Sequence, residues 1–254
     1  MRLDPCGPSS KMNPEPARTT DAAAQKPIIK KPKHYMPTEG YTEVVTPGEM
    51  GITKLHFGIL NLAPEATFFD HSEVTEVALI ALGGHCTLLV GHNGNKANGV
   101  LGERPDVFQG EACVAYIPHH TTYEVLAGEA GIEIAVCKVP SYAESAAIIL
   151  GAGETVDESE THLRIWESTL SAKADVGTTN AHMMLMGEEA ICLHRFRDAD
   201  GVATFDITRT VGTVRVQLYH NDVLAVPEQD NIVALTSEGV GYQLWVQPNL
   251  CRQG

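Results

Sequence analysis

Short apolar runs separated by turn residues dominate the chain from about residue 41 onward. A spacing of about 8–12 residues between such runs is typical of an antiparallel sandwich or barrel. The Gly83-Gly84 pair predicts a tight hairpin turn, and 141–149 is the best candidate for a helix. The strands predicted in this half cover 52–62, 76–82, 85–91, 113–118, 122–128 and 132–139.

A second series of strands follows, with a cleaner alternation. Apolar Ala203, Phe205 and Ile207 alternate with polar neighbours, and 214–218 repeats the pattern. A period of two indicates strands that bury one face only. The remaining strands are predicted at 222–227, 232–236 and 242–247.

The two halves also share a faint repeat, because 113–125 and 222–235 both read as a strand ending in Pro, a short turn and another strand. Duplicated small barrels explain this pattern. We predict one β module over residues 41–145 and a second over 160–250. Residues 1–40 are rich in Pro, Ala, Thr and charge, which predicts a disordered leader or an extended arm.

Charge and cysteine usage narrow the partners and the compartment. The formal charge is −14, from 18 Lys and Arg against 32 Asp and Glu. Because such a surface repels phosphates and anionic lipid, we predict no nucleic-acid and no membrane partner. Six cysteines without paired short spacing indicate buried thiols of a reducing compartment, so a cytoplasmic protein is expected. Exposed strand edges favour a homodimer.

Metal-ligating residue types recur at a spacing that resembles the first cupin motif, G-x5-H-x-H-x3–4-E-x6-G. Inward-facing side chains on neighbouring barrel strands bring such groups to one point. The run 177–189 supplies His182, then Met184 in place of a second His, then Glu188 or Glu189, and Asn231 stands where a last His is expected. We predict a divalent metal, Zn or Mn, on His182, Glu188 and Glu189, or a site that has lost its metal.

Particular segments resemble a narrower family. The run 99–128, with G-E-R-x-x-V-F followed by Y-I-P, and the run 132–141 are similar to the N-terminal module of the 5-deoxy-glucuronate isomerases of inositol catabolism. The segments 188–196, 221–227 and 241–247 resemble the C-terminal module more weakly. The resemblance implies an all-β fold of two cupin-like barrels, with a small sugar acid as substrate.

The reaction that the resemblance implies is an aldose–ketose isomerisation through an enediolate. It needs a base, an electrophile and a cation for the substrate carboxylate. The catalytic candidates are His182, Glu189 and Arg195. The substrate-binding candidates are Arg215, Gln217 and His194.

Ordinary polar positions at turns and on exposed strand faces are the alternative for each of these residues. The alternative function is a metal-free, non-catalytic cupin that binds a small ligand or a protein partner. Met184 and Asn231, at two expected ligand positions, favour that alternative.

Overall fold

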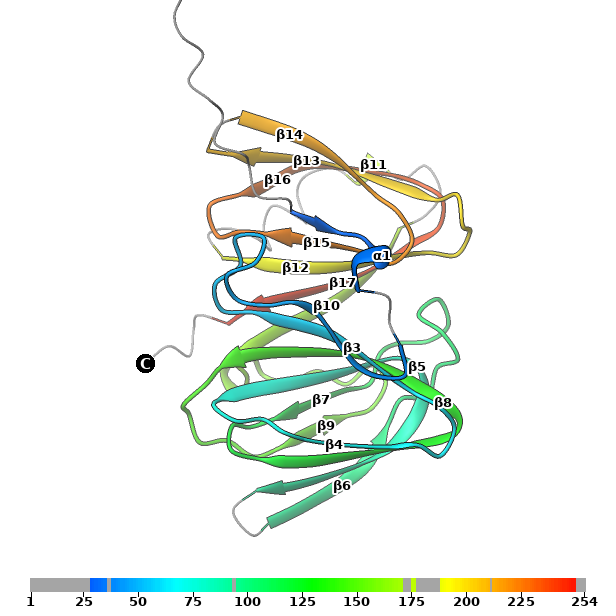
Figure 1. The fold of residues 1–254 in the computed structure, drawn as a ribbon, viewed down its shortest axis with the longest axis vertical. Coiled ribbons are helices and arrows are strands. Elements are labelled where there is room, and N and C mark those ends of the chain that lie inside the picture. The colour runs from blue at the N-terminus through cyan, green and yellow to red at the C-terminus, as the bar shows by residue number, and fades with distance from the viewer. Residues whose placement is uncertain are drawn as a thin grey trace, which may run out of the picture.

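The computed structural model describes residues 28–35, 38–92, 95–170, 175–176, 188–210 and 212–249. Strands form nearly all of its regular structure, and they build two stacked modules (Figure 1). The all-β prediction is therefore confirmed.

The N-terminal module holds one folded sheet in the order β2-β3-β8-β5-β7-β9, with β4 on β8 and β6 on β5. Its interior is filled by apolar side chains such as Leu79, Leu88 and Val125. The strands are β2 (Gly40–Val45), β3 (His56–Leu62), β4 (Thr67–His71), β5 (Thr75–His92), β6 (Asn95–Leu101), β7 (Val114–Ile117), β8 (Thr122–Pro140) and β9 (Ile148–Leu150).

The long strands β5 and β8 pair along most of their length and bend at two register shifts. Two predictions made from the sequence are wrong in this module. Gly83 and Gly84 form no hairpin, because they pair with Glu133 and Ile132 of β8 between two register shifts. A Cβ on Gly84, whose φ is +85°, would meet the Gly131 carbonyl oxygen at 2.2 Å. Glycines that permit a turn also permit a bulge that bends a continuous strand. The predicted helix at 141–149 is absent, since its end forms β9 against β7.

The C-terminal module holds two sheets, in the orders β1-β15-β12-β17-β10 and β11-β16-β13-β14. Phe196, Phe205 and Trp245 pack between them. Its strands are β10 (Leu163–Leu170), β11 (Asp175–Val176), β12 (Ala190–Phe196), β13 (Val202–Arg209), β14 (Gly212–Leu218), β15 (Asp222–Val226), β16 (Asn231–Glu238) and β17 (Gly241–Pro248). A 3₁₀ turn (Glu158–Glu160) precedes β10.

The segment before β2 attaches to this second module. Strand β1 (Ile29–Lys30) pairs with β15, and the short helix α1 (Pro32–Tyr35) follows. The Lys31 ammonium contacts the buried Asp222 carboxylate and lies over the Tyr219 ring. The part of the predicted arm that the structure describes is therefore an ordered strap. Residues 1–27 lie outside the described residues.

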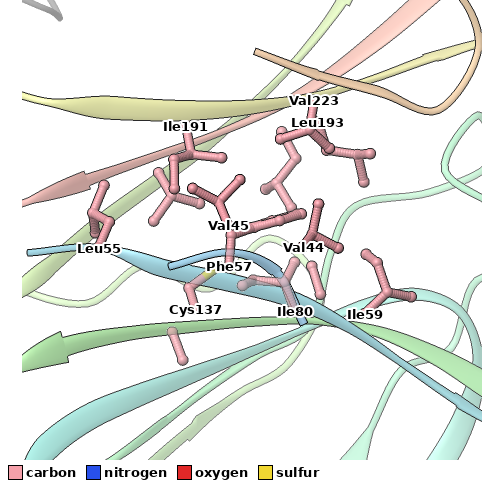
Figure 2. Close-up of a cluster of buried hydrophobic side chains, with 14 of the residues drawn as sticks. Val44, Val45, Leu55, Phe57, Ile59, Ile80, Cys137, Ile191, Leu193 and Val223 are labelled. Carbon is pink, nitrogen blue, oxygen red and sulfur yellow. The ribbon is translucent and has the colours of Figure 1, made fainter. Parts of the chain in front are cut away.

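One apolar layer joins the two modules. Val45, Phe57 and Ile80 of the N-terminal module meet Ile191 and Leu193 of β12 there (Figure 2). Each fully buried aliphatic side chain contributes about 1.5–3 kcal/mol. The modules therefore share a core at their contact.

An ion pair between a buried arginine and a half-buried glutamate crosses the same layer. Arg104, 3% exposed, donates from Nη2 to Glu167 Oε1 of β10 at 2.6 Å and from Nε to the Ala81 carbonyl at 3.1 Å. Tyr242 of β17 donates its hydroxyl to the same Glu167 oxygen. The G-E-R run thus ties the two modules together through its arginine.

Replacing this arginine tests the tie. Arg104→Met leaves the half-buried Glu167 carboxylate without its cation, so the free energy of unfolding is expected to fall by about 1–3 kcal/mol. Urea unfolding measures the change. The matched control is Arg215→Met, since Arg215 pairs with Asp206 on the exposed face of β14; its unfolding midpoint should not move. Equal effects of the two substitutions would contradict the assigned role of Arg104.

Candidate functional site

Strand β12 and the residues before it divide the candidate site between two faces. Its even-numbered residues Cys192 and Phe196 belong to the C-terminal interior, while Ile191 and Leu193 belong to the layer between the modules. Successive side chains of a strand point to opposite faces. Neighbouring candidate residues on this strand, such as His194 and Arg195, therefore point to opposite faces and cannot line the same cavity.

Glu189 lies on the side of the N-terminal module. Its carboxylate is 3% exposed and accepts four hydrogen bonds. The donors are Thr53 N and Oγ1 at 2.7 Å, Lys54 N at 2.7 Å and Leu55 N at 2.8 Å. The carboxylate therefore holds the loop before β3 in place.

The side chains of Arg195 and His194 also lie on opposite faces of β12. The Arg195 guanidinium makes a two-pronged ion pair with Glu133 of β8, at 2.8 and 2.6 Å. His194 is fully buried in the C-terminal interior, where Gln243 contacts its Nδ1 at 3.2 Å. Burial, with a smaller effect from His220, lowers the pKa of His194 to about 3. This imidazole is therefore neutral at pH 7.

Arg215 and Gln217 lie on the outer face of β14. Both are exposed, whereas Val214 and Val216 point toward the interior. The Arg215 side chain pairs with Asp206 at 2.7 Å on the neighbouring strand. These two candidates therefore lie outside the barrel interior, because the apolar members of the alternation occupy that side.

His182 lies outside the described residues, so its role stays a prediction. Of the two neighbouring carboxylates, Glu188 is half-buried, and its Oε2 has no hydrogen-bond partner among the described residues. Burial raises the pKa of Glu188 above its usual value, opposed by the charges of Arg164 and Lys54. Glu188 therefore has a stronger tendency to take up a proton than an exposed glutamate.

The described residues do not fit a divalent metal. No group of three or more His, Cys, Asp or Glu side chains among them lies close enough to hold an ion. The interior positions of β12 carry Ala190 and Cys192, and Trp245 lies opposite Cys192. Complete burial raises the pKa of the Cys192 thiol well above its usual value, which disfavours the thiolate that binds metal.

A cleft of about 540 Å³ opens where β10 meets the N-terminal module. Trp166, Tyr116 and Val114 supply apolar surface, and Arg164 and Gln247 supply polar groups. Pockets of this size with few polar groups are typical of small-ligand sites. The cleft is therefore the strongest candidate site among the described residues.

Paired strands place the polar groups of the cleft side by side. Arg164 of β10 pairs with Gln247 of β17 in the register, and Trp166 stacks on its partner Trp245 at 6.1 Å. Arg164 Nη2 lies 3.0 Å from Glu158 Oε2 in an exposed ion pair. The buried Gln247 amide nitrogen has no hydrogen-bond partner among the described residues. The cleft wall thus offers a cation and an amide donor to a ligand.

The prediction from sequence missed Arg164, Trp166 and Gln247. A weak signal was present, because polar and aromatic residues alternate with aliphatic ones in R-I-W and in Q-L-W-V-Q. This pattern indicates two strands, each with one polar and aromatic face. Only the pairing of the two strands brings these residues together.

Comparison with known proteins places the chain in a family. The KduI/IolB family model matches residues 29–164, more than half of the chain. The chain belongs to the KduI/IolB family. Members of this family are isomerases. The matched region contains the N-terminal module and the start of β10, including Arg164.

Solved structures agree on the fold. An IolB-like protein from Salmonella typhimurium LT2 is 19% identical, with a TM-score of 0.72 over 89% of this chain and 94% of that chain. An oxalate decarboxylase structure is 11% identical, with a TM-score of 0.63 over 96% and 86%. The Bacillus subtilis oxalate decarboxylase at pH 4.6 is 11% identical, with a TM-score of 0.62 over 88% and 77%. These likenesses show that the KduI/IolB chain has two cupin-type modules.

Two further comparisons are brief. No curated protein sequence matches this KduI/IolB chain. In the part of the chain that the structure describes, no helix is both long and apolar enough to cross a membrane.

The neighbouring carboxylates are expected to affect stability in opposite directions. Glu189→Gln places an amide NH₂ among four donors and should lower the free energy of unfolding by about 2 kcal/mol or more. Glu188→Gln should leave it unchanged or raise it at pH 7, because a raised folded-state pKa means that the ionised form costs stability above that pKa. Urea unfolding at pH 7 compares the two. A loss in Glu188→Gln as large as that in Glu189→Gln would contradict this assignment.

Proposed function

We propose that this chain is a sugar-acid isomerase that converts 5-deoxy-glucuronate, or a closely related deoxy-uronate, into the corresponding ketose acid in inositol catabolism. The proposal rests on membership of the KduI/IolB family. One structural observation carries it further. A single cleft wall combines a guanidinium, a buried amide donor and an aromatic face. The charge of Arg164, one of these wall residues, also acts on the pKa of Glu188, which burial raises.

Each group has a role in this chemistry. Arg164 binds the substrate carboxylate, and its exposed pair with Glu158 costs little to give up. The Trp166 indole covers the apolar face of the sugar chain. The Gln247 amide donates a hydrogen bond to the substrate oxygen on which negative charge develops.

Glu188 is the base in this scheme. It removes the proton from the carbon next to the aldehyde, which gives the enediolate, and returns it to the former carbonyl carbon. The proton of the neighbouring hydroxyl passes to the former carbonyl oxygen, which completes the ketose. Because burial raises its pKa, Glu188 is a stronger base than an exposed glutamate. No oxidant or reductant is consumed, because one carbon loses the hydrogen that the other gains.

A metal-free binding protein is the second candidate. Among the described residues, apolar side chains make up most of both barrel interiors, and the polar His194 and Gln243 contact each other in the C-terminal one. On this alternative the same cleft binds a sugar acid or a protein segment without turnover. Both proposed functions therefore predict binding of a ligand in the cleft, and only the isomerase predicts formation of a product.

An isomerisation assay of the purified full chain distinguishes the isomerase from the binding protein. We expect 5-deoxy-glucuronate to be converted to the ketose acid, followed by NMR, with and without EDTA. Glu188→Gln should reduce kcat by about 100-fold or more, and Arg164→Gln should raise KM by about tenfold or more. If the unaltered chain binds 5-deoxy-glucuronate saturably but forms no product, the isomerase proposal is wrong and the binding-protein proposal takes its place.

The pH profile supplies a matched control. Glu228 is an exposed carboxylate whose charge raises the pKa of Glu188. Activity needs ionised Glu188 and is lost as pH falls through its pKa. Glu228→Gln should therefore retain kcat and shift this acid limb to lower pH. An acid limb that persists unchanged in Glu188→Gln would show that another group acts as the base.

A further inference from the structure

An apolar surface lies at the end of the N-terminal module. We call it the end face: the outward side chains of the four neighbouring strands β4, β8, β5 and β6. It carries four of the exposed large apolar residues of the described chain. These are Phe69 (66% exposed), Val100 (60%), Leu126 (42%) and Leu89 (40%).

Strand registers make these residues neighbours. Leu126 pairs with Thr67 and Thr87, and Thr87 pairs with Val100, so one row crosses all four strands. The next row joins Phe69, Glu124, Leu89 and Asn98 in the same way. An apolar patch that continues across adjacent rows marks an interaction surface more strongly than scattered residues do.

The end face lies away from the C-terminal module, and no other element of the described part of the chain packs on it. Strand β6 lies at the end of the molecule opposite the C-terminal module (Figure 1). The inward residues of these strands, such as Leu88 and Val125, already fill the N-terminal core. No other element among the described residues covers the end face, so we consider a partner from another molecule.

Charge distinguishes a second copy from other partners. The outward positions of the two rows and of the adjoining row 71–122–91–96 carry one lysine, Lys96, and one acid, Glu124. The whole chain has a formal charge of −14. Two copies can meet at this balanced face without repulsion, and a two-fold arrangement lets each Lys96 approach the partner's Glu124.

Shape and area fit a weak symmetric contact. A hollow of about 380 Å³, lined by residues that include Leu89, Asn98 and Thr122, lies beside the protruding Phe69. Four strands spaced about 4.8 Å apart and three rows give a face of roughly 400 Å² per copy. Contacts this small are weak and depend on concentration.

We propose that the end face is the contact between two copies of this chain in a two-fold dimer. The ridge at Phe69 of each copy packs toward the hollow of the other. The dimer is independent of the proposed isomerase activity, because the cleft that contains Arg164 and Trp166 is lined by strands outside the end face.

Sedimentation velocity of the full chain, from about 1 to 200 μM, tests the proposal. The unaltered chain is expected to form a reversible dimer in the micromolar range. Val100→Thr with Leu126→Thr keeps β-compatible residues and should raise the dissociation constant at least tenfold. Lys96→Glu, which leaves two acids on each face, should also weaken the dimer.

Tyr142→Ser is the matched control, because Tyr142 is 80% exposed and lies outside the end face; its dissociation constant should not change. Circular dichroism and thermal unfolding establish that each variant remains folded. The proposal is overturned by a monomer at every concentration. It is equally overturned if the folded double variant dimerises as the unaltered chain does, or if Tyr142→Ser weakens the dimer as much.

Discussion

The apolar layer between the two modules determines the arrangement of everything else. Each module buries one sheet face in this layer and the other face in its own interior. Strands such as β12 are therefore buried on both sides. Polar groups there need partners, which Arg104 finds in Glu167 and Glu189 finds in three consecutive residues before β3. These polar contacts fix the orientation of two sheets that apolar packing alone would allow to slide.

The same layer explains where the chemistry can lie. Residues that face it are committed to holding the modules together, and the barrel interiors are occupied mostly by apolar side chains. Space for a ligand remains at the edge of β10, where the contact between the modules ends. Arg164, Trp166 and Gln247 meet at this edge because β10 and β17 are paired in register. The candidate site is thus a consequence of how the modules stack.

Family resemblance and site chemistry reside in different parts of the chain. The G-E-R run, which carried the resemblance, places Arg104 at the contact between modules. A segment can therefore identify a family through a structural role, while the residues that act on a ligand follow from neighbouring strands. Membership of the KduI/IolB family and the position of the cleft are separate observations that support the same class of reaction.

The pattern of apolar and polar residues was enough to predict the all-β class and most strand positions, because a period of two is a local property of the backbone. The sequence also carried the family resemblance, since that depends on a continuous run of residues. It could not distinguish a hairpin from a bulge at Gly83-Gly84, nor decide that Arg215 faces solvent and Glu189 faces the other module. Those outcomes depend on which strands pair and which faces are covered. Only the tertiary structure decides them, because the pairing joins residues such as Arg164 and Gln247 that are far apart in the chain.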